Sequence, residues 1–205
     1  KTGTSLWGLY LVDVFDNMTL IYEQEGCGIF EPFPFKPRRR PAPIADIVNT
    51  EQDTARVYIQ DIYFGRGLPG VPRGTVKKLR LFYWYYAPRG KGGHNRLGTE
   101  SGWDVKAILG TVPVEEDGSA SFIIPANTPI SLQPLDAENR SLQLMRSWLV
   151  GMPGENVSCY GCHETQNDVG ASKATRAMKR APSQIEPWYG PTRPFGFENE
   201  VYPVV

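Results

Sequence analysis

The chain contains few histidines and cysteines, 2 and 3 of its 205 residues. A Ser-His-Asp catalytic site therefore has little to draw on, and the sequence shows neither a phosphate-binding glycine loop nor a nucleophile elbow. An excess of one charge is also absent, because 22 Lys and Arg balance 22 Asp and Glu. This balance argues against binding to nucleic acid or to an anionic membrane, since both attract strongly basic surfaces. We expect small-molecule or protein partners instead.

Long apolar runs are absent as well. None approaches the roughly 20 residues needed to span a bilayer, so the sequence predicts no membrane span, and no signal peptide is visible. The chain begins with Lys1 rather than methionine and ends at Val205 without a polar tail. We therefore expect a segment of a longer protein, for which a missing signal peptide says nothing about export.

The composition favours β structure. Twenty-one Gly and 18 Pro interrupt the chain too often for long helices, and 12% aromatic residues favour sheet. Short apolar segments separated by acidic or Gly-containing turns are typical of a β-sandwich. The predicted strands are 55–63, 75–86, 103–114, 119–125, 130–135 and 141–148.

Three further segments have distinct patterns. Residues 6–22 contain two apolar runs around an Asp-Asn turn, which predicts a β-hairpin. Residues 30–43 are rich in proline and include three consecutive arginines, which indicates a stiff connector. Residues 170–180 combine strong helix formers with basic residues in the last turn, and they predict a short helix.

The most informative stretch is Cys159-Tyr160-Gly161-Cys162-His163. Two cysteines two residues apart, followed at once by histidine, are typical of c-type haem attachment: each thiol adds to a haem vinyl group and the imidazole can reach the iron. Three alternatives compete with this interpretation. The cysteines could form a disulfide, act as a redox dithiol, or join His163 and Cys27 in a structural zinc site.

If a haem is bound, other residues are candidates to contact it. Arg146 could pair with a propionate, or cover apolar surface with its stem, and Trp148 could pack on the porphyrin or occupy a core position. His94 lies in a Gly-rich loop, 88–102, and is otherwise an exposed loop histidine. The candidates for a second iron ligand, chosen by residue type, are Met145, Met152, Tyr160 and His94.

Several stretches together resemble one family. They are Gly8–Phe15, the Pro/Arg connector, Gly70–Val76, Leu109–Gly118, Met145–Trp148 and Pro153–Glu164. These stretches resemble the middle domain of the hydrazine synthase alpha subunit and its relatives, which are large exported haem proteins. In that family a β-propeller precedes the domain and a second haem c domain follows it.

The resemblance implies a domain organisation in four parts. They are propeller exit strands at 1–25, a linker at 26–54, a β-sandwich-like domain at 55–150, and a haem c segment with a tail toward a further domain at 151–205. It also implies Cys159 and Cys162 as thioether attachment points and His163 as the residue next to the iron. In hydrazine synthase the histidine of this motif is thought to bind zinc, and a tyrosine four residues later to take the iron. Here that position is Asn167, which favours His163 as the ordinary proximal ligand.

The sequence thus predicts a mainly β protein: a β-sandwich-like domain with a short helical, haem-binding segment toward its C-terminal side. The expected function is that of an exported, periplasmic domain with one covalent haem c, in electron transfer or redox chemistry on a small molecule, beside other redox subunits or domains. A haem-dependent oxidoreductase is one form of this hypothesis, but hydrazine synthesis itself is not assigned. The alternative is a non-enzymatic β-sandwich interaction module with structural zinc at the same motif.

Overall fold

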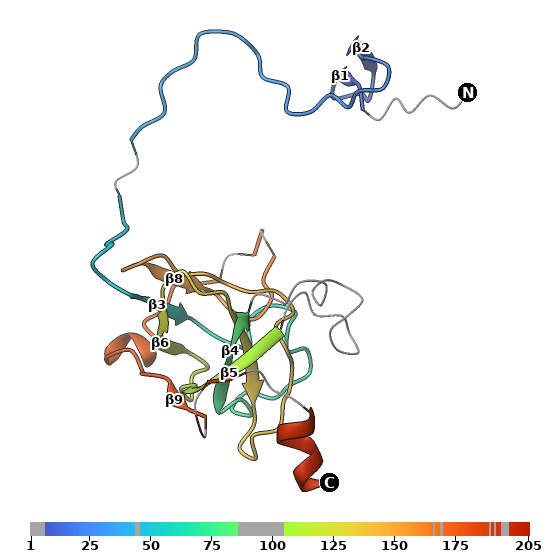
Figure 1. Ribbon diagram of the computed structural model, residues 1–205. Helices are drawn as coiled ribbons and strands as arrows, with labels where there is room; N and C mark the ends of the chain where they lie inside the picture. The colour runs from blue at the N-terminus through green and yellow to red at the C-terminus, as the bar shows by residue number, and fades with distance from the viewer. Residues whose placement is uncertain are drawn as a thin grey trace. The chain divides into compact units, whose positions relative to one another are not determined.

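The structure is a computed structural model that describes residues 7–43, 46–85, 105–165, 167–168, 170–188, 190, 192–193 and 197–205. The chain divides into two compact units, residues 1–45 (unit 1) and 46–205 (unit 2), which Figure 1 shows. His94 and the predicted loop 88–102 lie outside the described residues. The part of the chain that the structure describes contains no helix long and apolar enough to cross a membrane.

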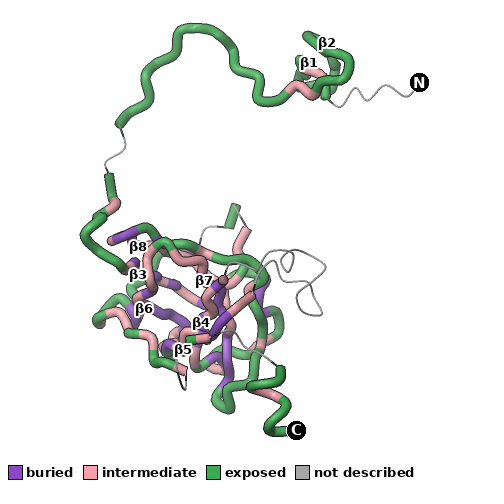
Figure 2. Tube along the Cα trace, in the orientation of Figure 1, coloured by how far each residue is buried: buried purple, intermediate pink, exposed green. Residues whose placement is uncertain are grey.

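Unit 1 contains a β-hairpin of β1 (Leu9–Val12) and β2 (Met18–Tyr22), which pair antiparallel. Its turn is built on Asp13, whose carboxylate accepts hydrogen bonds from the backbone N–H groups of Phe15 (2.8 Å) and Asn17 (3.0 Å). The hairpin predicted over residues 6–22 is therefore confirmed. None of the residues described between 7 and 43 is buried, as the colouring in Figure 2 shows.

The first sheet of unit 2 has three strands in the order β6-β3-β8. Its central strand β3 (Thr54–Ile59) pairs antiparallel with β6 (Ala120–Pro125) and parallel with β8 (Asn156–Cys159). The parallel partner is necessarily distant in sequence, because a crossover must separate parallel strands. This pairing brings residues 156–159 beside residues 56–59.

The second sheet has the order β7-β4-β5-β9. Its long central strands β4 (Lys78–Tyr85) and β5 (Val105–Pro113) pair antiparallel, with β7 (Ile130–Leu135) along the other side of β4. The short strand β9 (Glu186–Pro187) pairs with β5 at Gly110, where a Cβ atom would overlap the Glu186 carbonyl. Strands β8 and β9 thus join residues from 151–205 to the sheets formed by residues 54–135.

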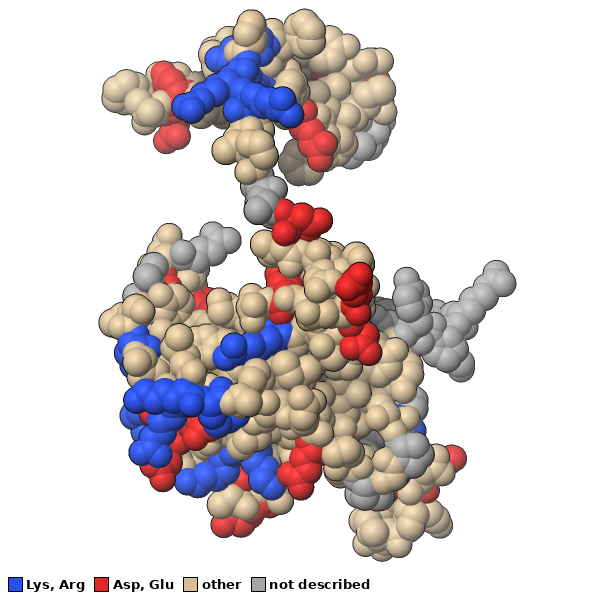
Figure 3. Space-filling model, turned by 90° about the vertical axis from the view of Figure 1, so that its left-hand side faces the viewer, with Lys and Arg blue, Asp and Glu red and all other residues tan. Residues whose placement is uncertain are grey.

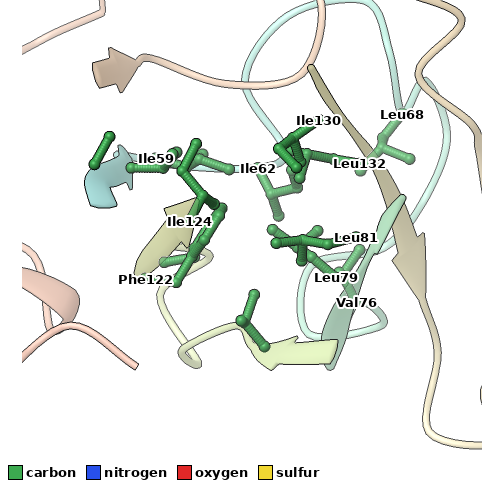
Figure 4. Close-up of a cluster of buried hydrophobic side chains, with 14 residues drawn as sticks. Ile59, Ile62, Leu68, Val76, Leu79, Leu81, Phe122, Ile124, Ile130 and Leu132 are labelled. Atoms are coloured by element: carbon green, nitrogen blue, oxygen red, sulfur yellow. The ribbon is translucent and has the colours of Figure 1, made fainter. Parts of the chain in front are cut away.

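The core of unit 2 lies between these sheets. Alternate residues of each strand point inward, as the period of two in a strand requires. Figure 4 shows Ile59, Phe122 and Ile124 from the first sheet together with Leu79, Leu81 and Leu132 from the second. The mainly β, sandwich-like fold predicted from the sequence is confirmed.

The strand predicted at 141–148 is wrong. The segment makes only isolated bridges to β7, at Ser141 and Leu149. The reason is Pro134 in β7, which accepts a hydrogen bond from the N–H of Leu142 (3.0 Å) but has no N–H to donate in return. A continuous ladder cannot form at that position.

The helix predicted at 170–180 is reduced to one 3-10 turn, η1 (Ala177–Lys179). Side chains of unit 2 bind this segment in an extended form instead: the Thr175 hydroxyl pairs with that of Tyr58 (2.9 Å), and the N–H of Arg176 donates to the Asp117 carboxylate (2.8 Å). Tertiary contacts have overridden helix propensity. The other short helical elements are η2 (Phe197–Val201), a π-helix, and η3 (Tyr202–Val204), both at the C-terminal side.

Basic and acidic side chains lie side by side on the face of unit 2 in Figure 3. The ion pairs near η1 fit that mixed pattern: Arg176 pairs with Glu116 (2.6 Å) and Arg180 with Glu115 (2.5 Å). These pairs fasten residues 170–183 to the turn between β5 and β6.

Candidate functional site

The cysteine motif begins at the end of an edge strand. Cys159 is the last residue of β8 and lies opposite Ile59 of β3. The hydrogen bonds continue past the strands, because the N–H groups of Gln60 and Asp61 donate to the carbonyls of Cys159 (3.0 Å) and Tyr160 (2.9 Å). The strand pairing therefore fixes where the motif leaves the sheet.

The loop Phe64-Gly65-Arg66-Gly67 holds the rest of the motif. The N–H of Cys162 donates to the Phe64 carbonyl (2.9 Å), and the Cys162 carbonyl accepts from the N–H of Gly67 (2.9 Å). The contact is so close that a Cβ atom on Gly67 would overlap the Cys162 Sγ atom. We call residues 64–67 the clamp loop. The sequence alone did not single out this stretch, although its two glycines are a signal for close backbone approach.

Asp61 anchors the start of the clamp loop, because its carbonyl accepts a hydrogen bond from the N–H of Phe64 (2.9 Å). Its carboxylate accepts a hydrogen bond from the N–H of Tyr63 (3.2 Å) and forms ion pairs with Arg73 (3.0 Å) and Lys173 (3.2 Å). The Asp61 side chain is only 14% exposed, so it is shielded more than the arginine and the lysine that it binds. Two distant segments are thus fastened to the turn that receives the motif.

A cavity of about 750 Å³ opens beside the motif, between the edge strands of the two sheets. On the side of the first sheet it is lined by Ile59, Ile62, Cys159, Cys162, His163 and Glu164. On the side of the second sheet it is lined by Leu132, Pro134, Met145, Arg146, Ser147 and Leu149. Most of these side chains are apolar, and the charged ones come from Arg146 and Glu164.

Both thiols of the motif are half-buried at this cavity. Burial raises the pKa of Cys159 and of Cys162 above the usual thiol value, and the nearby Glu164 carboxylate raises both further. A reactive dithiol needs the opposite shift, toward thiolate at neutral pH. The raised pKa values therefore give no support to the redox dithiol, and the unpaired state of all three cysteines gives none to the disulfide.

His163 adopts an unusual backbone conformation. Its φ is 63°, in the left-handed region, which costs a residue with a Cβ atom about 1–2 kcal/mol. The His163 carbonyl accepts a hydrogen bond from the N–H of Arg66 in the clamp loop (3.3 Å), which helps to hold this conformation. The residue is exposed and lines the cavity. Such strain is often found where a side chain must be aimed.

The structure brings four of the five predicted site residues together: Cys159, Cys162, His163 and Arg146 line one cavity. Trp148 is not among the described residues that line it. Its ring packs instead on that of Trp84, with centroids 5.3 Å apart.

The remaining candidates are placed differently. Tyr160 packs on Phe64, with ring centroids 6.2 Å apart, and Met152 and Asn167 are exposed. Cys27 is an exposed thiol in unit 1. Among the residues that the structure describes, no group of three or more His, Cys, Asp or Glu side chains could hold a metal ion.

Comparison with protein families adds a direct finding. Residues 74–164 match the family model of the hydrazine synthase alpha subunit middle domain. Over these residues the chain is hydrazine synthase alpha-like. The matched segment runs from the approach to β4 through the cysteine motif, so it includes most of the residues that line the cavity but neither β3 nor the clamp loop.

A solved structure supports the fold of this hydrazine synthase alpha-like domain. Hydrazine synthase of Kuenenia stuttgartiensis is similar over 66% of the chain, with 21% sequence identity and a TM-score of 0.53. The present chain spans 21% of the length of that chain. A search of curated proteins gave no match.

Proposed function

We propose that unit 2 is a c-type haem domain in which Cys159 and Cys162 form the two thioether bonds and His163 binds the iron. One observation carries this proposal: both thiols and the imidazole-bearing residue line the same cavity of about 750 Å³. The spacing of the motif is the one used for haem attachment, and cavities of about 300–1,000 Å³ are typical for small ligands and cofactors.

The cavity lining fits a macrocycle better than a small ion. Apolar side chains such as Ile59, Ile62 and Leu132 suit the faces of a porphyrin, and they would exclude water from it. Arg146 suits a propionate carboxylate by a charge-assisted hydrogen bond. A structural zinc ion would instead need four ligands close together.

The residues of the chain would act mainly by holding the group. The clamp loop binds Cys162 and His163 through backbone hydrogen bonds, and β8 pairs with β3 at Cys159, which supports these residues as the ones that would hold a haem. A bound haem supplies one-electron chemistry at its iron. We therefore propose electron transfer, or redox chemistry on a small molecule, as the function of this domain.

The cellular context follows from the same chemistry. Covalent haem attachment of this kind takes place on exported chains, so we propose a periplasmic or otherwise exported protein. Other redox subunits or domains are the proposed partners, because an electron must arrive from and leave toward another centre. The reaction of the whole protein is a further question, since this chain spans 21% of the solved relative.

The test is export of the chain in a bacterial host that carries the haem-attachment machinery. We expect a coloured protein whose pyridine haemochrome spectrum is that of a haem with two thioether bonds. The double variant Cys159→Ala, Cys162→Ala should lose the covalent haem, whereas the control Cys27→Ala should keep it. A colourless wild-type protein with one zinc per chain would overturn the proposal and favour the interaction module.

A further inference from the structure

The position of the methionines distinguishes one of them from the rest. The chain has four, and three are exposed: Met18 by 65%, Met152 by 45% and Met178 by 59%. Met145 is half-buried, packs against the core and lines the cavity with the two motif cysteines. A polarizable thioether therefore faces the same space as the proposed attachment points.

The main chain around Met145 is anchored. Its N–H donates to the Leu132 carbonyl of β7 (2.9 Å), and Leu149 exchanges two hydrogen bonds with Ile130 (both 2.9 Å). The segment 142–149 is thus fastened along the edge of the second sheet. A side chain on such a segment is positioned by the sandwich itself rather than by a free loop.

Met145 and His163 lie at the edges of different sheets. His163 follows β8, at the edge of the first sheet, and Met145 lies along β7, at the edge of the second. A planar group in the cavity between these edges would meet one residue from each sheet. We propose that Met145 would bind the haem iron as its second protein ligand, from the second sheet; this inference rests on the proposed function.

The other candidates by residue type are less suited. The ring of Tyr160 packs on Phe64 and approaches Gly170 so closely that a Cβ atom there would lie 2.5 Å from it. Met152 is exposed, and its N–H donates to the Glu155 carboxylate (2.7 Å). Neither Tyr160 nor Met152 is among the described residues that line the cavity.

The assignment has a functional consequence. A methionine opposite histidine raises the reduction potential of a haem and fills the site at which a small molecule would bind. With Met145 as a ligand, the proposed function would therefore be electron transfer rather than redox chemistry on a small molecule.

The test compares three forms of the full chain, exported with haem attachment: wild type, Met145→Leu, and the exposed control Met152→Leu. Leucine keeps the approximate volume of methionine and removes the sulfur. Pyridine haemochrome spectra measure covalent haem in each form, whatever the axial ligand. The far-red charge-transfer band of the ferric protein, carbon monoxide binding to the ferrous protein, and the reduction potential then report on the ligand.

We expect equal covalent haem in all three forms. Wild type and Met152→Leu should show the thioether-to-iron band and resist carbon monoxide, whereas Met145→Leu should lose the band, bind carbon monoxide and have a lower potential. Two results would overturn the assignment of Met145 while leaving haem attachment intact. One is a wild-type protein that carries covalent haem but lacks the thioether-to-iron band, and the other is a Met145→Leu protein that carries covalent haem and keeps the band. Absence of covalent haem from the wild type would remove the proposed function, and this inference with it.

Discussion

The interior of the sandwich and its cavity end are built in different ways. In the interior, Val57, Leu79 and Phe122 are fully buried and meet across the two sheets. At the cavity end, Cys159 and Cys162 are only half-buried. There the chain is held by close backbone contacts at glycines and by backbone hydrogen bonds rather than by packed side chains. We therefore expect stability to come mainly from the interior, and the backbone hydrogen bonds of the cavity end to hold the chain around an open volume.

We expect the largest loss of stability when a buried side chain in the interior is shortened. Phe122→Ala removes a fully buried ring and should lower the free energy of unfolding by about 3–5 kcal/mol. Cys162→Ala, at the existing cavity, should cost only about 0.5–1.5 kcal/mol in the haem-free protein, because it removes a single heavy atom from a half-buried side chain, as Ile→Val does in a core. Urea unfolding of both variants measures the contrast. Equal losses would show that the cavity end is packed like the interior.

An intermediate effect should follow a change in the clamp loop. Gly65 and Gly70 both have positive φ, 93° and 76°, so alanine at either position pays a similar backbone cost of about 1–2 kcal/mol. Only at Gly65 would the new Cβ atom also meet the Cys162 carbonyl, at 2.6 Å, whereas nothing lies within 4 Å at Gly70.

Gly65→Ala should therefore destabilise the chain by about 1–3 kcal/mol more than Gly70→Ala, as expected for overpacking. It should also reduce haem attachment at Cys162, which peptide mapping would detect. If the two variants unfold at the same urea concentration and carry the same haem, the clamp loop does not position the motif.

The smallest effect concerns the electrostatics of the cavity end. Burial, and then the Glu164 carboxylate, raise the pKa of the Cys159 and Cys162 thiols. Glu164→Gln removes the negative charge, so both pKa values should fall, the thiolate fraction near pH 8 should grow, and alkylation of the haem-free protein should become modestly faster.

The exposed thiol of Cys27 provides an internal control in the same sample, because Glu164→Gln should leave its alkylation rate unchanged. The variant keeps an oxygen that can accept the hydrogen bond that the N–H of Tyr160 now donates to Glu164 (3.1 Å). Slower alkylation of the motif thiols in Glu164→Gln would contradict the assigned effect of the carboxylate.

The same two regions differ in how far the sequence predicts them. The sequence predicts the strands at 119–125 and 130–135 almost to the residue, because each is a short apolar run bounded by turn residues. Strand β8 was missed because its four residues, Asn156–Cys159, are too few to show a pattern. Its parallel pairing with β3 depends on the folded sandwich.

Sequence and structure contribute different parts of the candidate site. The spacing of Cys159, Cys162 and His163 predicts haem attachment, and this stays a prediction. The cavity could not be predicted, because it exists only where the edges of the two sheets meet. Met145 could be proposed from the sequence only by residue type, whereas its burial and its bond to Leu132 single it out.

The central claim is a covalent bond between this chain and a haem, and the intact mass of the exported protein under denaturing conditions tests it most directly. Denaturation releases zinc and any non-covalent haem, but thioether bonds survive. We predict a mass raised by one haem in the wild type and an unmodified mass in the Cys159→Ala, Cys162→Ala variant. An unmodified mass in the wild type, with both thiols still free to alkylate, would contradict the account.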